Sequence, residues 1–130
     1  MILLLSSLSY AKTITIKSEG NMMAFDVKEF TVKAGKKITV VMDNTSTIPV
    51  MKHNIVFLND ESKVTEVGTM AMSAPNYLPN HPAIIAATPL AGAGEKTKIK
   101  FKAPKVKGRY IYICTFPGHY NVMKGYMIVN

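Results

Sequence analysis

Short segments in which apolar and polar residues alternate recur along most of this 130-residue chain. In residues 97–103 (TKIKFKA), Thr97, Ile99 and Phe101 share one predicted strand face and lysines occupy the other. Further predicted strands cover residues 13–16, 29–32, 38–44, 53–59, 109–114 and 125–130. Turn signals separate them every 8–12 residues or so, a spacing typical of sandwiches and barrels. The sequence therefore predicts an all-β, antiparallel sandwich or barrel.

The region 60–80 (DESKVTEVGTMAMSAPNYLPN) departs from this alternation. Asp60 or Ser62 can cap one or two helical turns there. Pro75, Pro79 and Pro82 then prevent the helix from continuing. We therefore expect one short helical insertion near residues 60–80.

The length is sufficient for one domain with a core of its own. Because the chain holds a single cysteine, an internal disulfide is excluded. It carries 16 basic and 8 acidic side chains, a net charge of +8. The lysines alternate along predicted strands, which places them on solvated faces. With no nucleic-acid-binding motif beside them, we expect no nucleic-acid partner; acidic-surfaced protein partners, attracted by the field, fit the charge better.

The first residues, MILLLSSLSYAK, contain an apolar run from Ile2 to Leu5, and then Ser9 and Ala11 in the small-x-small pattern of a signal-peptidase site. The run is too short to span a membrane. We interpret residues 1–11 as a secretory signal remnant and residues 12–130 as the functional domain, in a periplasmic or otherwise extracytoplasmic protein. The alternative is a buried or frayed first strand.

Three side chains that bind soft metals lie in one predicted loop: Cys114, His119 and Met123. A tight loop can turn all three toward one point, and thiolate, imidazole and thioether together favour copper, with zinc less suited. A trigonal site of two histidines and a cysteine, with a weak axial methionine, is the blue-copper arrangement. His53 at the start of a predicted strand completes that set. We expect His81 to be an ordinary loop histidine.

These residues also carry a family resemblance. The block CTFPGH followed by VMKG, the segment MKHN (51–54) and the segment PLAGAGEKTKIKF (89–101) resemble azurin and the azurin-like auracyanins of the cupredoxin family. The resemblance runs from about residue 22 to the C-terminus, and plastocyanin-like proteins have a shorter Cys-to-His spacing. It implies a Greek-key β-sandwich or barrel of about eight strands with one type 1 (blue) copper per chain. The implied ligands are His53, Cys114, His119 and Met123.

The resemblance implies further roles for residues around the metal. Asn54, Thr115 and Lys52 would surround the ligands. Asn54 would connect the His53 strand to the copper loop, the segment from Cys114 to Met123. The patch for electron transfer would comprise Phe116, Pro117, Gly118 and Met51. Lys52 stands where azurin has a glycine whose carbonyl approaches copper, so we expect four-coordinate copper. The family's disulfide is absent, and the segment between His53 and Cys114 looks a little shorter than in azurin.

The function implied is that of a soluble type 1 copper protein that shuttles single electrons between redox donor and acceptor proteins. We expect no enzymatic activity, no small-molecule substrate and a mostly monomeric chain with weak self-association at most. An alternative is an extracytoplasmic copper carrier or chaperone. The nine methionines fit core filling, an adaptable apolar rim around His119, or additional Cu(I) capture.

A third hypothesis is an enzyme in which Cys114 is the nucleophile and His119 its base. No partnering Asn or Asp is evident for it, and Met123 would have no role. Multicopper oxidase or nitrite reductase chemistry needs additional histidine clusters, which three histidines cannot supply.

Overall fold

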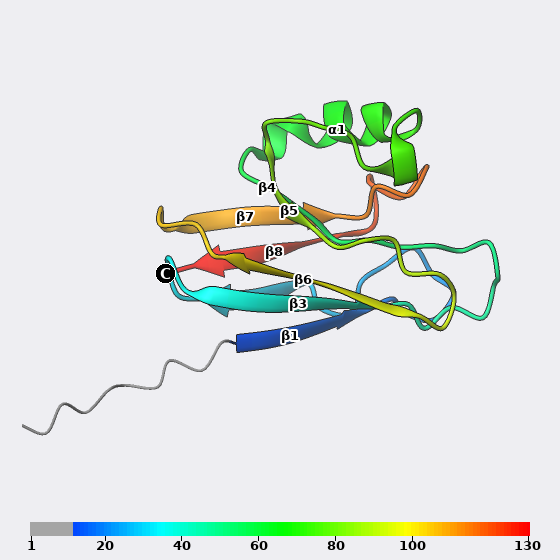
Figure 1. Cartoon of the computed structure of the whole chain (residues 1–130), viewed down its shortest axis with the longest axis horizontal. Coiled ribbons are helices and arrows are strands. Elements are labelled where there is room, and N and C mark those ends of the chain that lie inside the picture. The colour runs from blue at the N-terminus through cyan, green and yellow to red at the C-terminus, as the bar shows by residue number, and fades with distance from the viewer. Residues whose placement is uncertain (1–11) are drawn as a thin grey trace, which may run out of the picture.

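The computed structural model describes residues 12–130, which form two β-sheets packed as a sandwich (Figure 1). The three-stranded sheet has the order β1 (Lys12–Lys17), β3 (Lys37–Asp43), β6 (Lys96–Lys102). The five-stranded sheet has the order β2 (Glu29–Val32), β8 (Lys124–Val129), β7 (Gly108–Ile113), β4 (Val56–Leu58), β5 (Ile84–Ala87). These eight strands confirm the predicted all-β sandwich. The signal prediction for residues 1–11 lies outside the described residues.

Two strand pairs differ from the predicted antiparallel arrangement. Strand β1 pairs with β3 in parallel, and β2 pairs with β8 in parallel. The remaining pairs, β3 with β6, β4 with β5 and β7, and β7 with β8, are antiparallel. The period-two pattern shows which strand face is buried, but it carries no information on the direction of the neighbouring strand. The prediction was therefore wrong for the two N-terminal strands.

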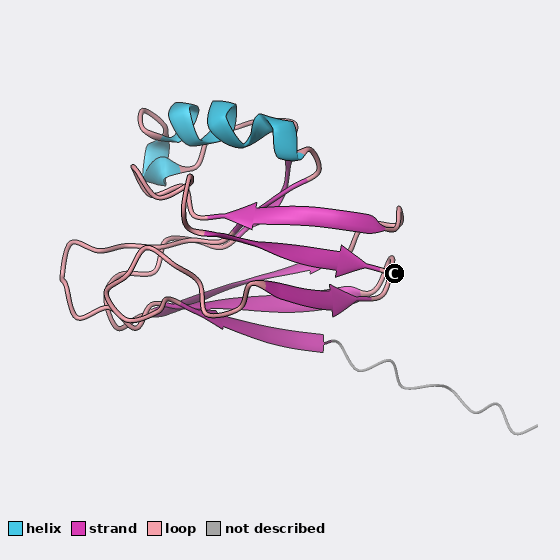
Figure 2. Cartoon of the chain, turned by 180° about the vertical axis from the view of Figure 1, so that it is seen from behind, coloured by secondary structure: helices cyan, strands magenta, loops and turns pink. Residues whose placement is uncertain are grey.

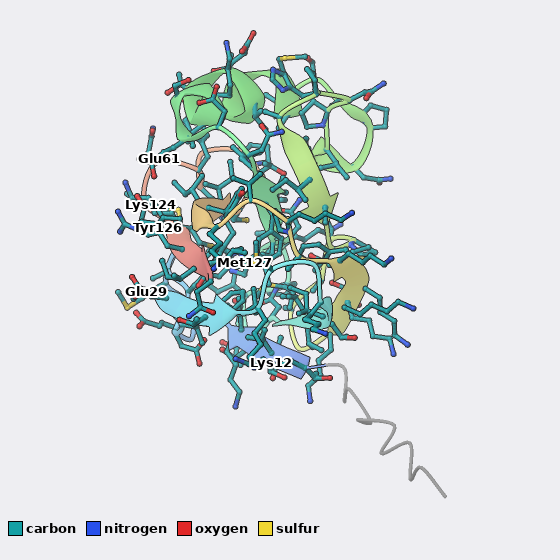
Figure 3. All side chains as sticks on the ribbon, turned by 90° about the vertical axis from the view of Figure 1, so that its left-hand side faces the viewer. Lys12, Glu29, Glu61, Lys124, Tyr126 and Met127 are labelled. Carbon is teal, nitrogen blue, oxygen red and sulfur yellow. The ribbon has the colours of Figure 1, made fainter. Side chains whose placement is uncertain are left out.

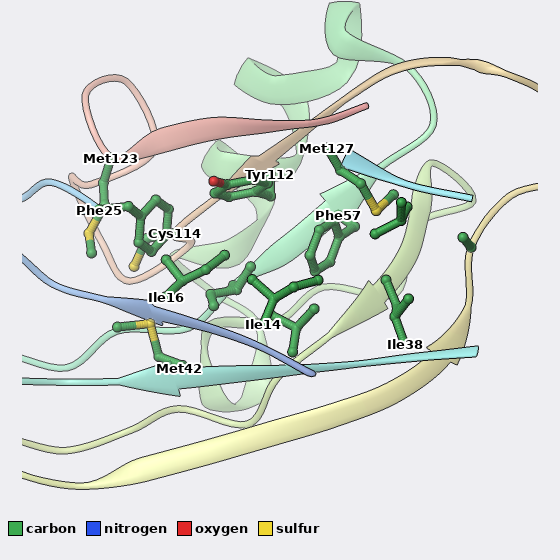
Figure 4. Packing of buried hydrophobic residues seen from close by; sticks show 14 of the residues in the cluster. Ile14, Ile16, Phe25, Ile38, Met42, Phe57, Tyr112, Cys114, Met123 and Met127 are labelled. Carbon is green, nitrogen blue, oxygen red and sulfur yellow. The ribbon is translucent and has the colours of Figure 1, made fainter. Parts of the chain in front are cut away.

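The core lies between the sheets and is built from the inward faces of both (Figure 4). Ile14 and Ile16 of β1 face the aromatic side chains of the five-stranded sheet, where the Phe57 and Tyr112 ring centroids lie 5.4 Å apart. Burying each such side chain stabilises the fold by about 1.5–3 kcal/mol. The hydroxyl of Tyr112 donates a hydrogen bond to Val27 O at 2.6 Å, so its polar tip is satisfied.

The helical insertion follows β4 and covers the outer face of the five-stranded sheet (Figure 2). It consists of η1 (Glu61–Lys63), α1 (Val64–Ala71) and η2 (Pro75–Tyr77). Asp60 is the N-cap, and its carboxylate accepts a hydrogen bond from Ser62 N at 3.0 Å, as predicted. Val67 of α1 is fully buried in a cluster with residues of β4 and β7. None of the helices in residues 12–130 is long and apolar enough to cross a membrane.

Two details of the fold differ from the predicted strands and bear on the site. The predicted strand 53–59 is regular only at Val56–Leu58, and His53 instead forms an isolated bridge with Ala91. Strand β5 was not predicted, because its sequence IIAA is a short apolar run without alternation. The end of β7 and the loop after it lie at the end of the sandwich opposite the C-terminus (Figure 1). That end carries the candidate site.

Candidate metal centre

Three potential metal ligands meet at this end of the sandwich: His53, Cys114 and His119. Cys114 Sγ lies 3.8 Å from His53 Nδ1 and 3.7 Å from His119 Nδ1. All three ligand atoms lie within 4.8 Å of one another, and all three side chains are buried. The fold therefore brings together residues that are 61 positions apart in the chain and turns their ligand atoms toward one point.

The loop between β7 and β8 folds back on itself and thereby positions its side chains. His119 N donates to Phe116 O at 3.0 Å, and Met123 N donates to His119 O at 2.9 Å. Cys114 N donates to Met123 O at 3.1 Å, which closes the loop. Gly118 has a φ of +84°, a left-handed conformation that favours glycine. The fully buried Met123 and Cys114 consequently lie at the same end of the core (Figure 4).

Asn54 and Thr115, each next to a potential ligand, are joined by two hydrogen bonds. Asn54 Nδ2 donates to Thr115 Oγ1, and Thr115 N donates to Asn54 Oδ1, both at 2.8 Å. Both side chains are buried, where a hydrogen bond is costly to break. This pair fixes the His53 segment relative to the Cys114 loop.

The helical insertion also holds this loop, through a residue that the sequence did not single out. Thr115 Oγ1 donates to Tyr77 O at 2.6 Å, and the Tyr77 ring packs edge-on against Phe116 with centroids 5.3 Å apart. Asn76 and Tyr77 both have positive φ, at 53° and 56°. A positive φ is strained for Tyr77, whereas asparagine tolerates it. Asn76 was therefore the local feature of the sequence from which a left-handed turn at this point could have been predicted.

A second contribution that sequence analysis missed comes from Asn44, which it treated only as a strand end. The buried Asn44 side chain donates through Nδ2 to Met51 O and to Ala91 O, both at 2.9 Å. Since Ala91 forms the bridge with His53, Asn44 braces the segment that carries this histidine. Both partners are distant in sequence from one another, so no local motif marks the role.

Burial sets the protonation states of the cluster. It lowers the pKa of His53 to about 4, with a smaller contribution from the nearby His119, and it lowers the pKa of His119 in the same direction. Burial also raises the pKa of the Cys114 thiol to about 11. At neutral pH both imidazoles are therefore neutral, the form that binds metals, and the thiol must release a proton when a metal binds. His53 Nε2 is buried without a hydrogen-bond partner in the described part of the chain.

The distances within the cluster fit a single metal ion bound by all three ligand atoms. Bonds of about 2.0–2.1 Å to nitrogen and about 2.3 Å to sulfur place the nitrogen and sulfur atoms about 3.5–3.8 Å from each other. The observed distances of 3.7 and 3.8 Å from Cys114 Sγ to the two imidazole nitrogens lie in this range. Together with the buried thioether of Met123, this donor set suits copper.

The residues of the predicted electron-transfer patch differ in exposure. Met51, Phe116 and Pro117 are half-buried, and Gly118 is exposed. The His119 side chain is 4% exposed, and its ring lies 5.1 Å from that of Phe116.

Two further residues from the sequence analysis lie outside the cluster. Lys52 is exposed, and its φ is not positive, since Asn76 and Tyr77 are the only such non-glycine residues among those described. His81 accepts a hydrogen bond at Nδ1 from Ala83 N at 3.0 Å, and its Nε2 lies 3.3 Å from a Glu66 carboxylate oxygen. His81 therefore holds the insertion together.

Comparison with known proteins agrees with this centre. Residues 12–130 match the family of copper binding proteins that comprises plastocyanin and azurin. Auracyanin-A of Chloroflexus aurantiacus is 41% identical over 123 residues, covering 91% of this chain and 74% of the relative. Azurin of Pseudomonas fluorescens biotype C is 37% identical over 121 residues, covering 86% of this chain and 93% of the relative.

Solved structures show the same likeness in three dimensions. The dithionite-reduced auracyanin of Roseiflexus castenholzii superposes with a TM-score of 0.84 at 42% identity, covering 92% of this chain and 98% of that one. Auracyanin A of Chloroflexus aurantiacus, described as a "blue" copper protein, gives a TM-score of 0.85 at 39% identity, covering 93% and 100%.

The eight-stranded sandwich and its buried His, Cys, His and Met side chains define the cupredoxin class of blue copper proteins, whose cofactor is one copper ion per chain. This chain belongs to the plastocyanin/azurin family of copper binding proteins.

Proposed function

We propose that the protein carries single electrons between redox proteins, with copper held by His53, Cys114, His119 and Met123. The observation that carries this proposal is the convergence of three buried ligand atoms, with Cys114 Sγ at 3.7 and 3.8 Å from two imidazole nitrogens. When bound, copper supplies the Cu(II)/Cu(I) couple. The family's electron-transfer role supports the same conclusion.

The protein's own residues keep the donor atoms in place while the charge of the site changes. Asn54 and Thr115 fix the ligand-bearing segments to each other, and Asn44 braces the bridge beside His53. Burial of the cluster excludes water from it. Because neither the frame nor solvent has to rearrange, little reorganisation opposes electron transfer.

Electrons would enter and leave beside His119, whose ring contacts Phe116 in a half-buried apolar surface. Weak contacts of this kind suit transient redox encounters, which bury less than about 1,200 Å². The partners would be redox proteins, and the positive charge would attract those with acidic surfaces. We propose neither an enzymatic activity nor a small-molecule substrate.

We do not favour the alternative copper carrier. Its support is the thioether content, including the exposed Met22 and Met72. Against it, Cys114 and Met123 are fully buried and His119 is nearly so, whereas passing a metal to an acceptor requires an open site. Rapid copper transfer from the loaded protein to an apo-acceptor would reverse this preference.

The variant His119→Gly tests whether His119 is the portal, that is, the side chain through which electrons enter and leave the site. We expect the copper to stay bound and the electron self-exchange rate to fall by at least about tenfold, since the connecting imidazole is gone. The matched control is His81→Gln, which replaces a histidine outside the cluster by another side chain able to form hydrogen bonds and should leave the rate unchanged. An unchanged rate in His119→Gly would refute the portal assignment.

We also propose an extracytoplasmic location, with residues 1–11 as the remnant of a secretory signal and residues 12–130 as the copper-binding domain. The support is the sequence pattern of the first residues. N-terminal sequencing of the protein recovered from its native cell fraction tests both points. Recovery of intact residues 1–11 from the cytoplasm would contradict them.

A further inference from the structure

The outer face of the three-stranded sheet is strongly and almost uniformly positive. Its outward positions follow from the strand register, because residues paired across neighbouring strands share a face. The inward neighbours, such as Ile38 and Val40 on β3, are buried in the core. The lysine face is formed by Lys17, Lys37, Lys96, Lys98, Lys100 and Lys102, all exposed.

One acidic side chain, Asp43, shares this face, so six lysines and one aspartate give it a net charge of +5. Asp43 Oδ2 lies 4.0 Å from Lys96 Nζ, and Lys96 is 67% exposed, so the pair neutralises little. In Figure 3, which looks along the strands, many nitrogen-tipped side chains project outward around this sheet. Most of the chain's net charge of +8 is therefore concentrated on one face.

This concentration acts against the stability of the fold. Lys37 and Lys102 are paired directly across β3 and β6, and like charges in such positions repel. Charged residues on an edge strand such as β6 can prevent sheet-to-sheet aggregation. Preventing aggregation does not require a lysine at every outward position of β6, from Lys96 to Lys102. It also does not require Lys37 directly opposite Lys102. An anionic ligand that lies across the face accounts for both.

The shape of the face indicates the kind of ligand. Successive lysines on β6 repeat every two residues, about 6.8 Å, so the row from Lys96 to Lys102 extends about 20 Å. The other outward residues are small or aliphatic, such as Thr13, Thr39 and Val41, so the face has no aromatic side chain for base stacking.

The type of cation points in the same direction. Lysine is a compact, hydrated point charge, whereas arginine recognises individual carboxylates and phosphates through its planar fork. The one arginine of the chain, Arg109, lies on β7 over the Tyr126 ring, away from this sheet. A broad lysine surface without arginine fits a diffuse plane of negative charge better than a shaped acidic protein site.

We propose that the lysine face binds the protein to the surface of an anionic lipid bilayer. Each lysine near such a surface strengthens binding about fivefold. The row begins at Lys96, next to Glu95, whose carbonyl accepts a hydrogen bond from Asn44 N at the metal-centre end of the sandwich. With the sheet lying flat on the membrane, the loop of His119 stays at the edge of the contact and open to a redox partner held in the same membrane.

The test is co-sedimentation of the full chain with phosphatidylcholine vesicles that contain about 30% phosphatidylglycerol, and with phosphatidylcholine alone. We expect binding to the anionic vesicles only, with loss at about 0.5 M salt because screening removes it. The triple variant Lys98→Gln, Lys100→Gln, Lys102→Gln should lower the partition coefficient about a hundredfold. Unchanged thermal unfolding establishes that this variant is folded.

The matched control removes the same charge elsewhere, through Lys33→Gln, Lys63→Gln and Lys124→Gln, and should lower binding by less than about tenfold. Equal losses in the two triple variants would overturn the proposal, since net charge alone would then explain binding. Salt-insensitive binding to phosphatidylcholine would overturn it as well. So would binding to polyglutamate without binding to anionic vesicles, which would make the face a site for acidic proteins. None of these readouts depends on electron transfer.

Discussion

Thr115 occupies the point where three segments of the chain meet. Its hydroxyl accepts a hydrogen bond from Asn54 and donates one to Tyr77 O, while its backbone N donates to the Asn54 side chain. These contacts join the segment of His53, the copper loop and the helical insertion. The geometry of the metal centre therefore depends on Thr115, although Thr115 is not one of the potential metal ligands.

The substitution Thr115→Val tests this role, because it keeps the shape of the side chain and removes its hydroxyl. It leaves the Asn54 amide and the Tyr77 carbonyl without their partner in a buried site, so we expect the free energy of unfolding to fall by about 1–3 kcal/mol. Urea unfolding of the copper-free protein measures the change. Thr13→Val, at an exposed strand position, is the control and should be nearly neutral. Equal effects in both variants would refute the role of Thr115.

The sequence was sufficient to predict the residues of the cluster but not their supports. Cys114 and His119 were identified because a thiol and an imidazole close together in one loop with Met123 suit few chemistries other than soft-metal binding. His53 was identified because it completes the blue-copper ligand set and matches the family resemblance. Asn44 and Tyr77 were not identified, since each acts through hydrogen bonds to residues that are neighbours only after folding. Polar residues of this kind are common at strand ends and turns, so their presence alone carries little information.

At the scale of elements, the contact between α1 and the copper loop is unusually close. A Cβ atom at Gly68 would lie 2.3 Å from ring atoms of Tyr120, which follows His119. Only a glycine lets the helix approach the loop this closely. The helical insertion thus supports the loop through two contacts: Gly68 lies against Tyr120, and Tyr77 contacts Thr115 and Phe116.

The substitution Gly68→Ala should destabilise the protein although alanine favours helices by about 1 kcal/mol over glycine. The clash forces the Tyr120 ring to move, at a cost of about 1–3 kcal/mol or more, so we expect a lower melting temperature. The double variant Gly68→Ala, Tyr120→Ala removes the clash. The effect of Gly68→Ala should therefore vanish or reverse in the Tyr120→Ala background, and an additive loss would contradict the close contact.

The elements themselves were predictable to different degrees. Strands β6 and β8 follow the alternation of their sequences closely, and Asp60 caps the insertion as its side chain predicts. The parallel pairing of β1 with β3 and of β2 with β8 was not predictable. The relative direction of two paired strands depends on how the chain crosses between the sheets, which the alternation pattern does not show. Strand β4 begins only at Val56, and His53 before it forms a bridge with Ala91, a residue distant in the sequence that the local pattern does not reveal.

At the scale of the whole molecule, the buried histidines couple stability to pH. Burial lowers the pKa of His53 from an ordinary value of 6.5 to about 4 and lowers that of His119 as well. Between these two pH values the unfolded chain binds more protons than the folded one. The stability of the copper-free protein should therefore be full above pH 6.5 and fall by about 1 kcal/mol or more per pH unit toward pH 4.

Urea unfolding of the copper-free protein at several pH values across this window measures that slope. The variant His53→Gln removes one titrating group from the buried cluster and should flatten the dependence. A slope that is the same in the variant and in the original protein would show that His53 does not control the pH dependence.

The central claim concerns Cys114 as a copper ligand in a trigonal plane with His53 and His119. Its most direct test is the addition of Cu(II) to the purified copper-free protein, with the visible and EPR spectra recorded together. We predict an intense blue absorption band and a narrow copper hyperfine splitting, the spectrum expected if the Cys114 thiolate binds copper in that plane. A pale solution with an ordinary tetragonal Cu(II) EPR spectrum would contradict the claim.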